Sequence, residues 1–133
     1  MSDGENTIGL EFVIAVHDEI LALTTGLAGV DKDELEGALA RPDQQMHYNG
    51  VDDIFEIGAW YAVAIAKAHA FNDGNKRTGL SVMLTYLDLQ GVTVPDHVGL
   101  DDTMVEVVES KDDHEVIVLA LAAYIRSLVT VEE

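Results

Sequence analysis

The sequence predicts an all-α domain, a compact bundle of about six helices. Apolar residues recur at helical spacing between capping signals, and no stretch alternates apolar and polar residues as a half-buried strand would. The chain has 133 residues, of which 48% are hydrophobic and two are proline, so it can fill one core and stay mostly helical. We therefore expect a single domain over residues 1–133, with an ordered core over residues 7–130.

Two helices are expected in the first third of the chain. The first begins at Thr7 and ends near residues 26–29, and one of its faces is a buried stripe of Leu10, Val13, Ile14, His17, Ile20 and Leu21. A second, short helix follows the capping box Asp31–Glu34 and ends at Pro42. This leaves residues 41–50 as a long loop.

Four further helices are expected in the rest of the chain. Residues 53–69 are apolar nearly all round, which is typical of a central, buried helix capped by Asp52 or Asp53. The next helix covers residues 75–90 and stops at Gly91. Two capping signals then open the last helices, over residues 102–110 and from the capping box Asp112–Glu115 onward.

The composition excludes several classes of function. Seven Lys or Arg against 25 Asp or Glu give a formal net charge of −18, which repels nucleic acid and anionic lipid, so neither is expected as a partner. The acidity fits either a generally solvated surface, as in a salt-rich cytoplasm, or an acidic face that docks a basic partner. The absence of cysteine excludes disulfides and Cys-ligated zinc.

The sequence also lacks membrane and export signals. The first residues, MSDGEN, have neither the basic nor the apolar region of a signal peptide. The longest apolar runs have 9 and 10 residues, about half of the length that crosses a bilayer. We therefore expect a cytoplasmic protein without a membrane span.

Residues 69–77 read HAFNDGNKR and surround a predicted turn between two helices. Unpaired backbone N–H groups at a helix start, with Lys76 and Arg77 beside them, form a cradle for phosphate. Without an anion, both cations would oppose the helix dipole at this position. Gly74 permits the close backbone approach that a bulkier residue would resist.

The other residues of this stretch suggest what the cradle does. Asp73 would be misplaced beside an anion unless it holds a cation such as Mg²⁺, which bridges carboxylates and phosphate oxygens. The Asn75 amide can orient a phosphate oxygen, and His69 can take a proton from an incoming hydroxyl. Phe71 is expected to be a buried anchor. Together these residues indicate phosphate transfer from a nucleotide to an alcohol, although each alone also fits an ordinary turn, cap or solvated pair.

Three histidines outside this stretch are expected in packing or surface roles: His17, His97 and His114.

The stretch His69–Thr78 resembles the Fic/Doc signature, and specifically its Doc (death-on-curing) branch, the toxin of a toxin–antitoxin pair. The similarity extends over residues 10–95, through VIAVHDEILAL, ELEGALARPDQ and DDIFEIGAWYAVAIAKAHAFNDGNKRTGL. The Fic branch has Gly at the position of Lys76 and a second Arg at the position of Leu80, and it moves AMP onto a target hydroxyl. Lys76 and Leu80 therefore favour the Doc branch.

The resemblance implies an all-α Fic/Doc fold and a protein kinase that uses ATP and Mg²⁺. The γ-phosphate would pass to a threonine of translation elongation factor Tu. The alternatives are Fic-type AMP transfer and a non-catalytic module that binds a nucleotide or peptide. His69 would be the general base and Asp73 the Mg²⁺ ligand, while the phosphates would be held by Gly74, Asn75, Lys76 and Arg77.

Some positions depart from the family pattern. Ala70 stands where the familiar form has Pro, but it contributes no chemistry, so activity is expected to remain. The inhibitory helix of many Fic proteins requires Gly or Asn after the glutamate, and Phe12 follows Glu11, so restraint is expected from a separate antitoxin. Residues 41–50 correspond to the flap that holds the target peptide, which gives three weaker candidates, Arg41, His47 and Tyr48.

Overall fold

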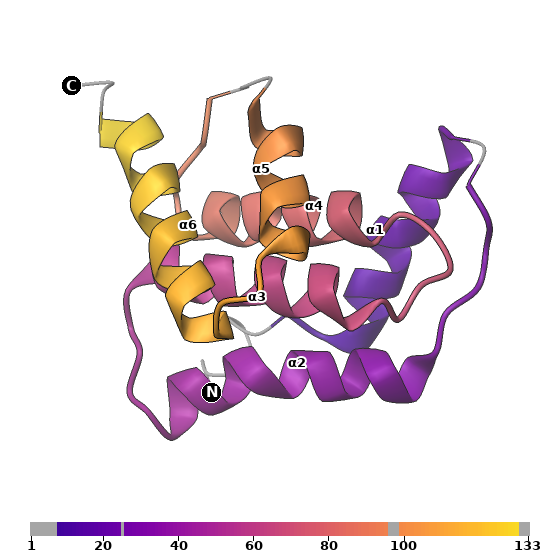
Figure 1. Cartoon of the computed structure of the whole chain (residues 1–133), viewed down its shortest axis with the longest axis horizontal. Coiled ribbons are helices and arrows are strands. Elements are labelled where there is room, and N and C mark those ends of the chain that lie inside the picture. Colours follow the sequence, from indigo (N-terminus) through magenta and orange to yellow (C-terminus); the bar gives the residue numbers. More distant parts are fainter. Residues whose placement is uncertain (1–7, 25, 96–98, 131–133) are drawn as a thin grey trace.

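The computed structural model describes residues 8–24, 26–95 and 99–130. These residues form a bundle of six α-helices and no strands, which confirms the predicted fold class (Figure 1). The helices are α1 (Leu10–Ala22), α2 (Lys32–His47), α3 (Ile54–Ala68), α4 (Asn75–Leu89), α5 (Gly99–Glu109) and α6 (His114–Thr130). No helix within these residues is long and apolar enough to span a bilayer.

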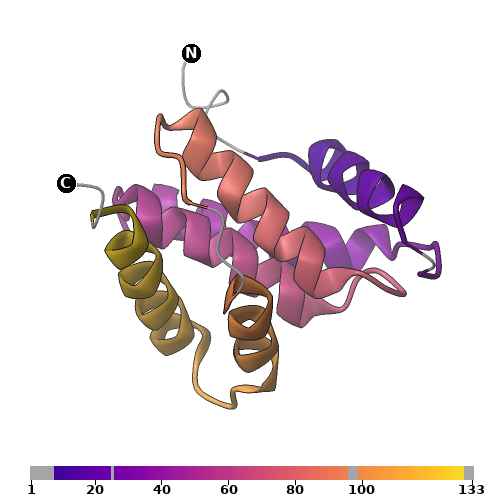
Figure 2. The same cartoon turned by 90° about the horizontal axis from the view of Figure 1, so that it is seen from above.

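The centre of the bundle is α3, as its all-round apolar sequence predicted. Every residue from Ile57 to Ala66 is buried. Helices α2, α4, α5 and α6 pack around α3, whereas α1 packs mainly on α4 (Figures 1 and 2). The Asp53 carboxylate caps α3 by accepting hydrogen bonds from the Phe55 and Glu56 N–H groups, and it also pairs with Arg126 of α6. These contacts fix the start of α3, and its other end leads directly into the turn with the site residues.

Helices α3 and α4 lie close together at Gly79. A Cβ atom at this position would lie 2.7 Å from the Ala62 carbonyl oxygen of α3. We expect Gly79→Ala to lower the free energy of unfolding by about 1–3 kcal/mol, because the two helices must move apart to admit the methyl group.

Gly37→Ala in α2 is the matched control. No heavy atom lies within 4 Å of the added Cβ, and alanine favours a helix interior, so this variant should gain about 0.5–1 kcal/mol of stability. Urea unfolding of both variants measures the difference. Equal stabilities would contradict the close approach at Gly79.

The predicted loop over residues 41–50 is wrong for residues 41–47, because α2 continues through Pro42 to His47. A proline inside a helix removes one backbone hydrogen bond and disfavours helical geometry in the residue before it. Pro42 is nevertheless buried and extends the apolar face of α2 that packs on α3, formed by Leu35, Ala38, Leu39 and Pro42. Burial of the ring offsets the lost hydrogen bond. The connection between α2 and α3 therefore begins only at Tyr48.

Other boundaries differ by a few residues. Helix α1 ends at Ala22, short of the predicted glycines, and its expected start at Thr7 lies outside the described residues. Helix α5 begins at Gly99, so Asp102 lies in its first turn and does not cap it. The last helix begins at His114, where the Asp113 carbonyl accepts from the Ile117 N–H, one residue later than a cap at Asp112 requires. The predicted caps Asp31 and Asp53 are confirmed.

Candidate functional site

The turn between α3 and α4 has the form that the sequence predicted, with His69 at the end of one helix and Asn75 at the start of the next. His69 is exposed and adopts the left-handed region, with φ of 55°. It is the only residue other than glycine with a positive φ in the described part of the chain. Such a conformation costs free energy for a residue with a Cβ atom. It persists here because the next two residues, Ala70 and Phe71, are buried.

A second segment, residues 26–31 between α1 and α2, holds the turn along its length. The Asp31 N–H donates to the Ala70 carbonyl at 2.7 Å, and the Asn72 N–H donates to the Gly29 carbonyl at 3.2 Å. Val30 and Phe71 form an isolated antiparallel bridge. The two segments lie side by side at the right of Figure 1. The bonds run between main chains, so no residue type in the sequence indicated this pairing.

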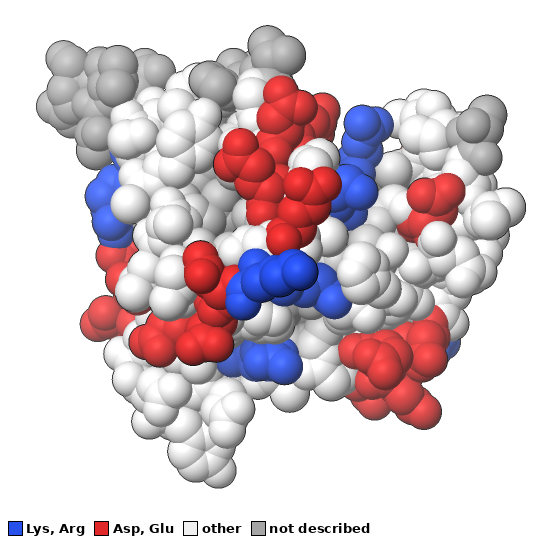
Figure 3. All heavy atoms as spheres, viewed as in Figure 1, with Lys and Arg blue, Asp and Glu red and all other residues white. Residues whose placement is uncertain are grey.

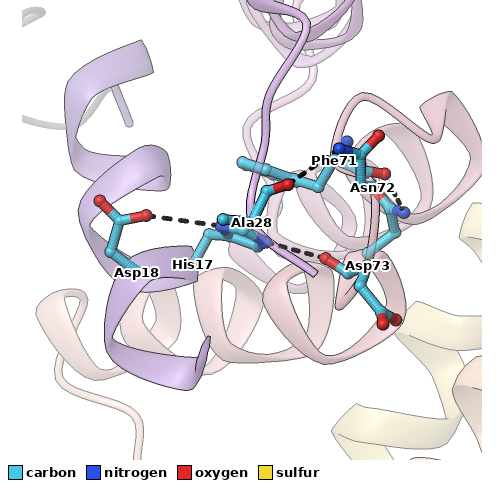
Figure 4. A network of polar contacts seen from close by, with 7 residues as sticks. His17, Asp18, Ala28, Phe71, Asn72 and Asp73 are labelled. Carbon is cyan, nitrogen blue, oxygen red and sulfur yellow. Dashed lines mark hydrogen bonds and ion pairs between the residues drawn. The ribbon is translucent and has the colours of Figure 1, made fainter. Parts of the chain in front are cut away.

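Gly29 shows how closely the two segments fit. Its φ is +130°, and a Cβ atom there would lie 2.2 Å from the Asn72 amide nitrogen. That nitrogen donates to the Ala28 carbonyl at 2.8 Å (Figure 4). The Asn72 side chain therefore ties the turn to the segment before α2.

Asn75 closes the turn from the other side. Its Oδ1 accepts from the Phe71 N–H at 3.1 Å, and its Nδ2 donates to the Phe71 carbonyl at 2.9 Å. The predicted contact of Asn75 with phosphate would therefore use the second hydrogen of the amide. Phe71 itself is 3% exposed, which confirms the predicted buried anchor.

Asp73 presents its carboxylate at the surface of the turn. Oδ1 accepts from the Gly74 N–H at 3.1 Å, and Oδ2 lies 3.4 Å from the Leu27 nitrogen. Each carboxylate oxygen has further lone pairs, so these contacts orient the group and leave it able to bind a cation. The predicted metal ligand is thus held by main-chain groups on either side of it.

A cavity of about 310 Å³ joins this carboxylate to the start of α4. Asp73, Gly74 and Arg77 line one wall, and the other wall comes from α1 and the residues after it: Ile20, Leu21, Thr24 and Gly26. His69 does not line this cavity. It lies at the opposite end of the turn, five residues before Gly74 in sequence.

The start of α4 differs from the starts of α2 and α3. Helices α2 and α3 each have an aspartate side chain that accepts from their first N–H groups and acidic residues in the first turn. Helix α4 has Gly74 as its N-cap and no side-chain cap, as is also the case at Gly9 of α1. However, α1 has Glu11 in its first turn, whereas the first turn of α4 has no acidic residue and carries Lys76 and Arg77. Its unpaired N–H groups and two cations make the same end of the helix attractive to an anion.

Both cations are available to a ligand. The Lys76 side chain is exposed and forms no hydrogen bond or ion pair with the described residues. Arg77 lies 4.0 Å from the Asp101 carboxylate of α5, and both side chains are more than half exposed, so this pair contributes little. Figure 3 shows Lys and Arg side chains in the middle of one face, between groups of acidic side chains.

Of the three weaker candidates, Arg41 and His47 lie in α2, and only Tyr48 lies in the connection between α2 and α3. Arg41 lies within α2 and lines a second cavity, of about 600 Å³, with Lys67, Ala68 and His114. Burial lowers the pKa of His114, which favours the neutral form of its ring. His47 is in the last turn of α2, and Tyr48, the residue after it, is 84% exposed. His97 lies outside the described residues.

Sequence reasoning missed one residue that touches the turn. His17 was expected only to pack, and it is 2% exposed. However, its ring also stacks on Phe71 and bonds to the main chain of Asp73 (Figure 4). Its helical spacing placed it on the buried stripe, but nothing in the sequence showed which loop that stripe faces.

Comparison with known proteins shows the family to which the chain belongs. The model of the Fic/DOC family matches residues 7–87, which include α1 to most of α4 and the whole turn. The protein called "Protein kinase doc" of Escherichia phage P1 is 39% identical over 99 residues, which cover 74% of this chain and 79% of that protein. The match of the family model over most of the chain and the identity to the phage protein show that this chain belongs to the Fic/DOC family, in its Doc branch.

Proposed function

We propose that the chain is a Doc-type protein kinase, which transfers the γ-phosphate of ATP to a Thr or Ser hydroxyl of another protein. The basic start of α4, which has no side-chain cap, carries this proposal, because it would attract an anion beside the Asp73 carboxylate in a protein with a net charge of −18. The similarity to a protein named a kinase supports the same reaction. Lys76 and Leu80, which distinguish the Doc branch from the Fic branch, support γ-phosphate transfer over AMP transfer.

The residues at one end of the turn would bind the phosphates, and the residue at the other end would act as the base. Lys76, Arg77, the N–H groups after Gly74 and the remaining hydrogen of the Asn75 amide would hold the phosphates. His69, exposed at the other end, would accept the hydroxyl proton. As the hydroxyl oxygen forms its bond to the γ-phosphorus, the bond from that phosphorus to the β–γ bridging oxygen breaks and ADP leaves.

The residues present fit a Mg²⁺ ion that arrives with the nucleotide. The described residues hold no group of three or more His, Asp or Glu that could bind a metal alone. Mg²⁺ in nucleotide sites is commonly bound by one or two carboxylates plus phosphate oxygens, and Asp73 supplies one such carboxylate beside the anion site. Bound there, the ion would neutralise charge that develops on the phosphates.

The partners follow from the Doc branch. The acceptor is proposed to be a threonine of translation elongation factor Tu, and the chain would act as a growth-arresting toxin in the cytoplasm. A separate antitoxin would restrain it, because Glu11 is followed by Phe12 and not by the Gly or Asn of the inhibitory helix.

One labelling experiment tests this function. The purified chain is incubated with elongation factor Tu and Mg²⁺, together with ATP labelled at either the α or the γ phosphorus. We expect label to reach the factor only from the γ position and the mass of the factor to rise by one phosphate. Label from the α position would show AMP transfer instead, and binding of ATP without any transfer would favour the non-catalytic module.

A further inference from the structure

The buried ring of His17 fixes the main chain of the proposed phosphate and metal site. Helix α1 carries His17, and the ring stacks on Phe71 with centroids 3.8 Å apart and planes 11° from parallel. Its Nε2 lies 2.8 Å from the Asp73 carbonyl oxygen (Figure 4). A carbonyl oxygen only accepts, so Nε2 carries the hydrogen of this bond. Nδ1 is 3.6 Å from the exposed Asp18 carboxylate, too far for a hydrogen bond.

This bond sets the orientation of the peptide group between Asp73 and Gly74. In a trans peptide the C=O and N–H point in opposite directions. With the Asp73 carbonyl directed at His17, the Gly74 N–H is directed away from the ring, where Asp73 Oδ1 accepts it at 3.1 Å. One peptide group therefore connects the buried ring to the carboxylate that lines the cavity.

Without the ring, little would prevent this peptide group from turning over. Rotating it changes ψ of Asp73 and φ of Gly74. Gly74 has φ of +82°, and glycine populates positive and negative φ about equally. A rotated group would withdraw the N–H from the Asp73 carboxylate and present a carbonyl oxygen toward the site for phosphate.

We propose that His17 is a positioning residue for Asp73 and for the start of α4. It touches neither the phosphates nor the hydroxyl. It locks the peptide group that orients the Asp73 carboxylate and the first N–H groups of α4. This inference rests on the proposed function, because those groups matter only if they hold Mg²⁺ and phosphate.

Two variants separate the hydrogen bond from the stacking. His17→Gln places a donor near the position of Nε2 without a ring, and His17→Phe keeps the ring without a donor. We expect His17→Phe to weaken binding of Mn²⁺·ATP, measured by calorimetry, by about tenfold, and His17→Gln to retain affinity within about threefold. In ¹⁵N NMR spectra, the Gly74 amide signal should move in His17→Phe and stay close to its wild-type position in His17→Gln.

Val13→Ala controls for lost stability. Val13 is fully buried on the same helix and does not contact the turn through any hydrogen bond. If Val13→Ala lowers the melting temperature as much as His17→Phe does, it should still bind Mn²⁺·ATP like wild type. Equal loss of affinity in both variants, or an unmoved Gly74 signal in His17→Phe, would overturn the inference.

The two proposals fail in different ways. A wild-type chain that binds no Mn²⁺·ATP and transfers no phosphate would reject the proposed function and, with it, the positioning role. Normal binding and transfer in His17→Phe would leave the function intact and reject the role of His17 alone.

Discussion

Replacing His69 by alanine should reduce phosphate transfer by about 10²–10⁴-fold, because the variant has no group to accept the hydroxyl proton. The change should leave the fold intact, since the side chain is exposed and lies outside the core. Transfer is measured by γ-label incorporation into elongation factor Tu. ATP binding should change little, because His69 does not line the cavity that holds Asp73 and Arg77.

His69→Gly makes the same test sharper, because stability and activity should move in opposite directions. His69 has φ of 55°, a conformation that a residue with a Cβ atom adopts only at a cost. Glycine relieves this strain, so His69→Gly should raise the free energy of unfolding by about 1 kcal/mol while transfer is lost. Full transfer in either variant would contradict the role of His69 as the base.

His47→Ala is the matched control for both variants. His47 is exposed at the end of α2, in the part of the predicted loop that the structure shows to be helical. We expect wild-type transfer in His47→Ala. A loss comparable to that in His69→Ala would instead restore the interpretation that residues 41–50 hold the target.

The local features of the site could be predicted from the sequence. The caps Asp31 and Asp53, the buried centre of α3 and the turn from His69 to Asn75 all depend on neighbours within a few residues, and all three are confirmed. Pro42 was misjudged because its intrinsic effect on a helix is unfavourable, whereas its place on the face of α2 that packs on α3 decides the outcome. Packing between helices outweighed local propensity there.

The long-range contacts of the site could not be predicted in the same way. The bridge between Val30 and Phe71 joins main chains, and the contact of His17 with Asp73 spans 56 residues. Asn75 illustrates the limit most clearly. Its residue type suits a phosphate, but its two polar atoms also match the N–H and C=O of Phe71, and only the fold shows that both are bonded there.

Asp73→Asn should lower transfer on the order of 10²–10³-fold, because it removes the negative charge that would hold Mg²⁺ beside the phosphates. The amide oxygen can still accept from the Gly74 N–H, and only the longer contact with the Leu27 N–H at 3.4 Å is lost, so the turn should keep its shape. The Mg²⁺ concentration needed for half-maximal transfer should rise in this variant.

Asp101→Asn is the matched control. It makes the same chemical change on a carboxylate that pairs weakly with exposed Arg77, and transfer in this variant should stay within about fivefold of wild type. If both variants lost transfer equally, general acidity of the surface, and not a metal ligand at Asp73, would account for the effect.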